Sequence, residues 1–201
     1  MTGLRERKRR QVHETISATA VALFLERGFD EVSVAEVAAA AEVSKPTLFK
    51  YFPTKEDLVL HRISDHQGEA ARIVRERAAG EAPLEALHRH FLAGLERRDP
   101  VTGLNDHPEV LGYHGMVFAT PALAARVFQY MARDEEALAV ALTALVDDLT
   151  ARLVAGQVLA TQRVLARRNW QALVDGETAD RAHPAAAAAA DHAFTLLPRI
   201  G

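Results

Sequence analysis

Basic, hydroxyl and aromatic side chains gather in one short stretch of the chain, from Ser33 to Lys55. The whole chain has four lysines against twenty arginines, yet Lys45, Lys50 and Lys55 all lie in this stretch. Ammonium and hydroxyl groups bind phosphate oxygens and the edges of bases. The residue types therefore indicate a surface that contacts nucleic acid, provided that the local structure turns them to one side.

Two short helices are predicted to position these side chains. Ser33 and Glu36 form a Ser-x-x-Glu capping box, in which each side chain satisfies a backbone N–H group that a helix start leaves open. Ser44 caps a second helix whose first turn tolerates Pro46, because an N–H group there has no partner within the helix. The first of these helices has an apolar face at Val34, Val37, Ala38 and Ala41.

The second helix is expected to turn its polar groups outward, with Leu48 and Phe52 on its inward face. After Pro53, Thr54 and Asp57 repeat the cap and open a third helix. Two helices joined by so short a turn fit a helix-turn-helix, whose second helix lies in the major groove of DNA. Lys45, Thr47 and Lys50 are expected to approach bases or the adjacent backbone, and Tyr51 and Lys55 to hold phosphates.

Here the chain resembles the tetracycline-repressor (TetR) family of bacterial transcription regulators. The resemblance covers residues 10 to 60 and rests on Phe24, Gly28, Phe29, Ser33, Val37, Ala38, Val43, Ser44, Thr47, Phe49, Tyr51, Phe52 and Lys55. Glu42 departs from it, because the family usually has glycine at the turn. The turn therefore either holds a non-glycine residue in a left-handed conformation at some cost or is built differently. Phe49 stands where the family often has tyrosine, so one hydroxyl for a phosphate is lost.

The DNA-binding residues predicted from the pattern and the resemblance are Ser33, Ser44, Lys45, Pro46, Thr47, Phe49, Lys50, Tyr51 and Lys55. Charge supports this location. The whole chain carries a net charge of −3, but residues 1–55 hold nine Lys/Arg against seven Asp/Glu. Five of these cations form an amino-terminal arm that either lies along phosphates or a minor groove or is a solvated tail. They are Arg5, Arg7, Lys8, Arg9 and Arg10.

The rest of the chain is predicted to be helical, because no alternating β-branched run appears. Helices are expected over about 9–27, 54–79, 84–98, 109–118, 120–147, 148–175 and 179–197, with a loop over 99–108. The fold class is all-α with nine or ten helices: an amino-terminal three-helix domain with the helix-turn-helix, residues 1–53, and a larger helical effector-binding and dimerisation domain, residues 54–201. The absence of cysteine, of a signal-peptide pattern and of an apolar run long enough to span a membrane points to the cytoplasm.

The alanine tract over 185–190 favours close helix packing, because alanine forms helices well and has a small side chain. The TetR resemblance implies that the last two long helices pair with those of a second subunit. Such a homodimer would read a palindromic operator in double-stranded DNA with its two reading helices. A close contact within one subunit is the alternative.

The resemblance also implies a cavity among the middle helices for a small, mostly apolar effector. The candidate lining residues are His66, His88, Phe91, His114, Phe118, Phe128, Met131 and Gln157. Gln157 interrupts an apolar face of its helix, so it is expected either to bond a ligand or to be bonded to backbone or exposed at the helix edge.

Two other functions stay open at this point. A helical metal-dependent hydrolase would use His61, Asp65 and His66, or the pair His107 and His114, but no HExxH, nucleophile elbow or phosphate loop accompanies them. We therefore expect no enzyme activity, no metal and no cofactor. The other alternative is a DNA-binding regulator without a ligand.

Overall fold

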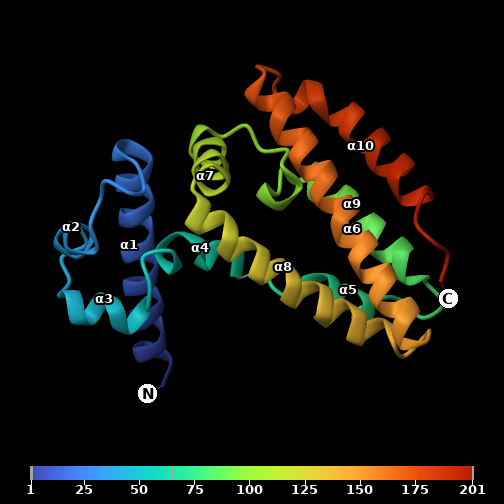
Figure 1. Cartoon of the computed structure of the whole chain (residues 1–201), viewed down its shortest axis with the longest axis horizontal. Coiled ribbons are helices and arrows are strands. Elements are labelled where there is room, and N and C mark those ends of the chain that lie inside the picture. Colours follow the sequence, from blue (N-terminus) through green and yellow to red (C-terminus); the bar gives the residue numbers. More distant parts are fainter. Residues whose placement is uncertain (1, 65, 201) are drawn as a thin grey trace. The chain divides into compact units, whose positions relative to one another are not determined.

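The computed structural model describes residues 2–64 and 66–200, and these residues form an all-α protein with ten α-helices and one short 3-10 helix. This confirms the predicted fold class. The helices are labelled in Figure 1. They are α1 (Thr2–Arg27), α2 (Val34–Ala40), α3 (Lys45–Tyr51), α4 (Asp57–Ser64), α5 (Glu69–Glu76), α6 (Pro83–Glu96), η1 (Pro100–Thr102), α7 (Pro108–Ala119), α8 (Pro121–Leu142), α9 (Asp148–Val174) and α10 (Ala179–Thr195).

The chain forms two compact units, and α7 and α8 contribute residues to both. One unit comprises residues up to 64 together with 112–128, and the other comprises 66–111 together with 129–200. The predicted division of function between residues 1–53 and 54–201 stays a prediction. Within the described residues, no helix combines the length and the apolar character that a membrane crossing requires.

The first unit is built around α1, which contacts α2 and α4, while α3 packs against α2 (Figure 1). Its core contains Ile16 and Phe24 from α1, Val37 from α2, Leu48 from α3 and Leu58 from α4, all almost completely buried. The inward position predicted for Leu48 is therefore confirmed. Burial of these apolar side chains stabilises the short helices α2 and α3, which would be marginal in isolation.

Helix α1 begins earlier than predicted. The sequence indicated a start near Arg9, but the helix runs from Thr2 and includes the basic segment that was expected to be an arm or a tail. Arginine, glutamate and lysine are good helix formers, and no proline interrupts them. The side chains of Arg7, Lys8, Arg9 and Arg10 are exposed, whereas that of Arg5 lies outside the described residues.

The long helix predicted over 54–79 is wrong, because the structure has two helices, α4 and α5, in its place. Gly68 precedes α5 in a left-handed conformation, with φ of 73°. Its N–H group donates to Asp134 Oδ1 at 2.8 Å, a partner from α8 that lies 66 residues further along the chain. The carboxylate satisfies a backbone donor that the break would otherwise leave open.

The second unit is organised by α6, α9 and α10, and α10 packs against both of the others (Figure 1). Helices α6 and α10 run antiparallel, and three polar contacts follow their seam. His88 Nε2 lies 2.9 Å from Asp191, Glu96 lies 3.2 Å from His183 Nε2, and Arg98 lies 2.7 Å from Asp180. The predicted loop over 99–108 contains the 3-10 helix η1, and α10 contains Pro184 in its interior.

Candidate nucleic-acid interface

The capping box at the start of α2 is present as predicted. Glu36 Oε2 accepts the backbone N–H and the hydroxyl of Ser33, both at 2.8 Å, and the N–H of Glu36 donates to Ser33 Oγ at 3.2 Å. Arg27 at the end of α1 donates to Glu36 Oε1 at 2.7 Å. The Ser33 backbone bond, followed by the bond from Arg27, lowers the pKa of Glu36 to about 2. The carboxylate thus joins the end of α1 to the start of α2.

The turn between α2 and α3 holds Glu42 in the left-handed region, with φ of 55°. Its N–H donates to Ala39 O at 3.1 Å, and the N–H of Val43 donates to Ala38 O at 2.9 Å. These two bonds are those of a Schellman motif, which normally places glycine at the left-handed position. The turn therefore holds a non-glycine residue in the left-handed conformation, the first of the two alternatives that the sequence left open. This backbone strain costs about 1 kcal/mol of folding free energy.

Ser44 caps α3 in the predicted manner. Its Oγ accepts the N–H of Thr47 at 3.2 Å and also lies 2.7 Å from Thr47 Oγ1. Since the two hydroxyls bond each other, part of the hydrogen-bonding capacity of Thr47 is used to hold the helix start. This lowers its capacity to read a base edge, the role expected from the sequence.

The outward face of α3 carries two cations and two apolar groups. Lys45, Pro46, Phe49 and Lys50 are exposed, whereas Thr47 and Tyr51 are half-buried. The Lys45 ammonium lies 5.9 Å from the centre of the Phe49 ring, a cation–π contact between consecutive turns. The face is both exposed and positively charged, as a helix that enters a groove of DNA requires.

Lys55 is fixed at the edge of this unit by two aromatic rings. Its Nζ lies 4.4 Å from the ring centre of Phe29 and 5.6 Å from that of Phe24. Lys55 also lies inside the capping box of α4, in which Asp57 Oδ2 accepts the N–H of Thr54 at 3.0 Å and its hydroxyl at 2.7 Å. The ammonium is therefore held beside a helix start, where backbone N–H groups also attract anions.

Arg126 from α8 is a residue of this unit that sequence reasoning missed. Its Nη2 donates to Asp57 Oδ1 at 3.0 Å, so the same carboxylate caps α4 and binds α8. The two residues are 69 positions apart in the sequence, so no local sequence pattern predicts their contact.

The eight residues predicted for an effector cavity lie in different surroundings. His114, Phe118 and Phe128 belong to the first unit, where both phenylalanines are exposed. In the second unit, His88 stacks on Phe194 with ring centres 4.7 Å apart. Of the remaining four, Phe91 is buried in the core, His66 lies 3.3 Å from Glu69, Gln157 is exposed on α9, and Met131 lines a pocket.

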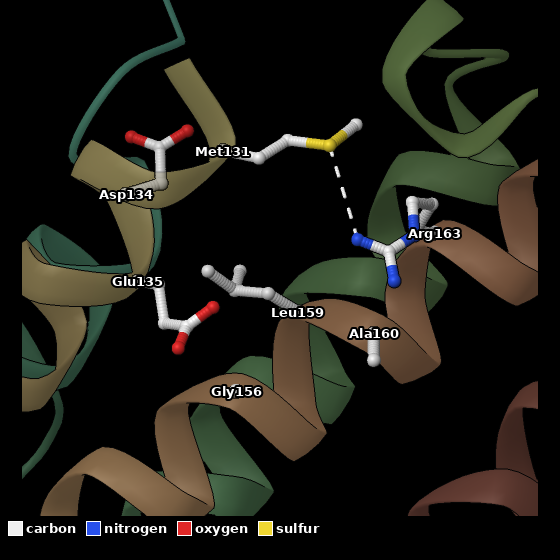
Figure 2. Close-up of a pocket in the computed structure, with 7 residues that line it drawn as sticks. All are labelled: Met131, Asp134, Glu135, Gly156, Leu159, Ala160 and Arg163. Carbon is white, nitrogen blue, oxygen red and sulfur yellow. Dashed lines mark hydrogen bonds between the residues drawn. The ribbon is translucent and has the colours of Figure 1, made fainter. Parts of the chain in front are cut away.

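That pocket has a volume of about 140 Å³ and lies between α8 and α9 (Figure 2). Apart from Met131, its lining was not predicted, because the two faces come from helices that meet only in the tertiary structure. The lining residues are Met131, Asp134, Glu135, Gly156, Leu159, Ala160 and Arg163.

The residues named for a metal-dependent hydrolase do not form such a centre in the described part of the chain. Asp65 lies outside it, and the Nδ1 atom of His61 lies 3.0 Å from the hydroxyl of buried Ser17. Among the described residues, no group of three or more His, Asp or Glu side chains is arranged to hold a metal ion.

Comparison with known proteins identifies the amino-terminal helices. Residues 16–61 match the sequence model of the family "Bacterial regulatory proteins, tetR family". The chain is 35% identical to the HTH-type transcriptional regulator TcmR of Streptomyces glaucescens over 135 residues, which cover 67% of this chain and 58% of TcmR. It is 30% identical over 83 residues to the uncharacterized HTH-type transcriptional regulator YuxN of Bacillus subtilis (strain 168), covering 41% of this chain and 28% of YuxN. The chain thus spans less than two thirds of the length of these relatives.

The fold is similar to solved structures over nearly the whole chain. The structure of NalD, the secondary repressor of the MexAB-OprM multidrug efflux pump in Pseudomonas aeruginosa, aligns with a TM-score of 0.65 and 18% identity, covering 94% of this chain and 98% of NalD. Salmonella enterica GusR aligns with a TM-score of 0.59 and 21% identity, covering 93% and 95% of the two chains. At these identities the two structures show the fold alone. The family match over residues 16–61 and the similarity to TcmR overturn the hydrolase alternative. Together with the capped geometry of α2 and α3, they show that the chain belongs to the tetR family of bacterial regulatory proteins, a family of DNA-binding transcription regulators and not of enzymes.

Proposed function

We propose that this protein is a homodimeric repressor that acts in the cytoplasm, binds a palindromic operator in double-stranded DNA and is released from it by a small molecule. The observation that carries this proposal is the exposed face of α3, where Lys45 and Lys50 flank Phe49. In helix-turn-helix proteins this helix enters the major groove.

The proposed DNA contacts divide into two kinds. Lys45, Phe49 and Lys50 lie on the exposed face of α3 and contact base edges or the adjacent backbone. Lys55 and Tyr51 at the margin of the unit bind phosphates and so fix the register without reading the sequence. Ser33, Ser44, Pro46 and Thr47 form the starts of α2 and α3, which approach the DNA backbone.

An exposed apolar stripe supports a dimer through α9 and α10. Leu149, Leu153 and Val164 of α9 are 67%, 56% and 64% exposed in the single chain, and Leu196 after α10 is 72% exposed. The small residues Ala185 and Ala188 are exposed on α10. A second copy would cover these surfaces, because large apolar faces are otherwise costly to leave in water.

Release by a small molecule is supported by the kinds of regulator to which the chain is similar. NalD is the secondary repressor of a multidrug efflux pump. A repressor of this kind is useful only if a signal can end the repression, and a small molecule is such a signal. We propose a mostly apolar effector with one or two polar groups. It must bind the form of the dimer that does not fit DNA more tightly than the form that does, and a thousandfold preference corresponds to about 4 kcal/mol.

Operator binding is tested with a DNA duplex that the protein itself selects. A 30-base-pair duplex is selected from a random library with the parent protein, and affinities are measured by fluorescence anisotropy. Lys50→Ala should weaken binding at least tenfold, whereas Arg75→Ala, which removes an exposed cation of α5, should leave it unchanged. Equal binding by both variants would place the reading face elsewhere.

The dimer has its own test. Ala190 is completely buried within the single chain, so a glutamate there would disrupt the fold itself, and Leu153 is the better probe. Leu153→Glu should yield a monomer in sedimentation and weaken operator binding. Phe128→Glu, a control at an exposed apolar residue of α8, should stay dimeric. A monomeric parent at micromolar concentration would remove the palindromic operator from the proposal.

The alternative of a regulator without a ligand is separated by the same assay. If the protein is inducible, a cell extract or compound collection that contains the effector releases the duplex. A protein that no small molecule releases is the constitutive regulator instead.

A further inference from the structure

The pocket between α8 and α9 is small and lies wholly within the second unit (Figure 2). Its volume of about 140 Å³ equals that of about five water molecules in the liquid. It therefore fits a molecule with few heavy atoms, or the end of a longer one. The side chain of Glu135 extends from α8 toward α9, that of Asp134 points the other way, and that of Arg163 extends from α9 (Figure 2). Glu135 and Arg163 are both exposed.

The charges around the pocket are of both signs and do not neutralise one another. Among the described residues, neither Glu135 nor Arg163 forms an ion pair, and the guanidinium of Arg163 reaches only the weak acceptor Met131 Sδ, at 3.8 Å. The next residue on α8 behaves differently, because Glu136 forms an ion pair with Arg152 of α9 at 2.6 Å. The same two helices thus form an ion pair beside the pocket but leave Glu135 and Arg163, which are exposed at its edges, without one.

Small residues on α9 leave room for the pocket. Gly156 and Ala160 lie one turn apart and both line the pocket. A Cβ atom at Gly156 would lie 3.3 Å from Glu135 Oε1, which is tight, so the absence of a side chain gives the carboxylate its room. Met131 and Leu159 add an apolar surface between the charged groups.

Asp134 connects the pocket to the start of α5. One of its oxygens accepts the N–H of Gly68 at 2.8 Å, and Asp134 is also one of the residues that line the pocket. Burial raises the pKa of Asp134, and the neighbouring charge of Glu69 acts in the same direction, while the Gly68 bond opposes both. An ammonium group in the pocket would favour the ionised form, because opposite charges attract strongly where water is partly excluded.

We infer that this pocket binds a small zwitterion, with its ammonium group against Glu135, its carboxylate against Arg163, and a short aliphatic body over Met131 and Leu159. One molecule then pairs with both the Glu135 carboxylate and the Arg163 guanidinium, whereas a simple cation or a simple anion would pair with only one of them. Binding of this zwitterion to the pocket does not rest on the proposed function, and the zwitterion is a ligand distinct from the mostly apolar effector proposed there.

The test uses the full chain and a series of ω-amino acids, from 3-aminopropanoate to 6-aminohexanoate, in isothermal titration calorimetry. Hexylamine and hexanoate carry the same body with one charge each. At least one ω-amino acid should bind saturably and at least tenfold more tightly than either single-charge compound. No saturable binding in the series overturns the inference, and equal binding of hexylamine overturns the zwitterion in favour of a cation.

Variants locate the site. Glu135→Gln and Arg163→Gln should each weaken binding of the best ω-amino acid at least tenfold, and Gly156→Leu should abolish it by filling the pocket. Glu136→Gln, the matched control outside the pocket, should keep the affinity within twofold. Retention of full affinity by the three pocket variants would show that the molecule binds elsewhere. Circular dichroism confirms that each variant is folded.

The two proposals fail separately. If the parent does not bind the selected duplex, the proposed function is lost, but the calorimetric result stands. If the parent binds the duplex and the ω-amino acids neither bind nor release it, only the pocket inference is lost. Glu135→Gln should bind the duplex like the parent in the absence of any small molecule.

Discussion

Substitution of Asp57 by alanine should destabilise the first unit and weaken its binding to DNA of any sequence. The Asp57 carboxylate accepts three hydrogen bonds, two from Thr54 at 3.0 and 2.7 Å and one from Arg126 at 3.0 Å. Alanine removes the carboxylate half of the capping box of α4 and the contact with α8 together, while the bond from the backbone N–H of residue 57 to Thr54 Oγ1 at 3.2 Å remains. Lys55 lies within the capped turn, so its ammonium loses the fixed position that a phosphate contact requires.

The expected magnitude follows from the exposure of the two charged groups. Loss of the carboxylate half of the capping box, with its two hydrogen bonds from Thr54, costs about 1 kcal/mol. The side chain of Asp57 is 16% exposed and that of Arg126 is 36% exposed. The exposure of this ion pair is thus intermediate between that of a surface pair and that of a buried pair. After a discount for solvent screening we assign about 1 kcal/mol to the ion pair. Asp57→Ala should therefore lower the free energy of unfolding by about 2 kcal/mol.

A double-mutant cycle separates the two contributions. Urea unfolding followed by circular dichroism is measured for Asp57→Ala, Arg126→Met and the double variant, and the coupling energy should be about 1 kcal/mol. The exposed pair of Glu136 and Arg152 is the control and should show a smaller coupling, although its atoms are closer, at 2.6 Å. A coupling no larger than that of the control would show that the pair of Asp57 and Arg126 does not stabilise the unit. Unchanged affinity of Asp57→Ala for the selected duplex would refute the link to Lys55.

Three further substitutions test single features of the interface. Glu42→Gly should stabilise the protein by about 0.5–1 kcal/mol, because glycine removes the left-handed strain at a smaller entropic cost, and a rise in the melting temperature is the readout. The pKa of Glu36 is lowered from its ordinary 4.5 to about 2. The stability that its capping box contributes is therefore present above pH 4.5 and is lost as the pH falls toward 2. Glu36→Gln should flatten the pH dependence of the melting temperature between these two pH values. Lys55→Ala should weaken binding to selected and random duplexes alike and reduce the slope of log affinity against log salt by about one, whereas a change of sequence preference would assign Lys55 to base reading.

Features set by neighbours in the sequence were predictable. The caps at Ser33, Ser44 and Thr54 depend on hydrogen bonds to a residue three positions later, and each is present in the structure. The inward position of Leu48 followed from helical periodicity. At Glu42 the sequence left two constructions of the turn open, and the structure shows the left-handed one, with the backbone bonds of a Schellman motif.

Features set by distant residues were not predictable. The break between α4 and α5 depends on Asp134, which binds Gly68 from 66 residues away, so the apolar periodicity of residues 54–79 wrongly indicated one helix. Arg126 carried no signal in its own segment. Gln157 has an apolar neighbourhood in the sequence, yet the face it shares with Leu153 is exposed in the chain.

The all-α fold and the capped helix-turn-helix over residues 33–58 could both be predicted, because they follow from periodicity and from bonds within one helical turn. Which helical faces are covered, how α8 reaches the capping box of α4, and where charges of opposite sign are left without an ion pair became known only from the packing of the helices. Burial and charge pairing depend on which helices meet in space. A single helix has several faces, and only its neighbours determine which of them is withdrawn from water.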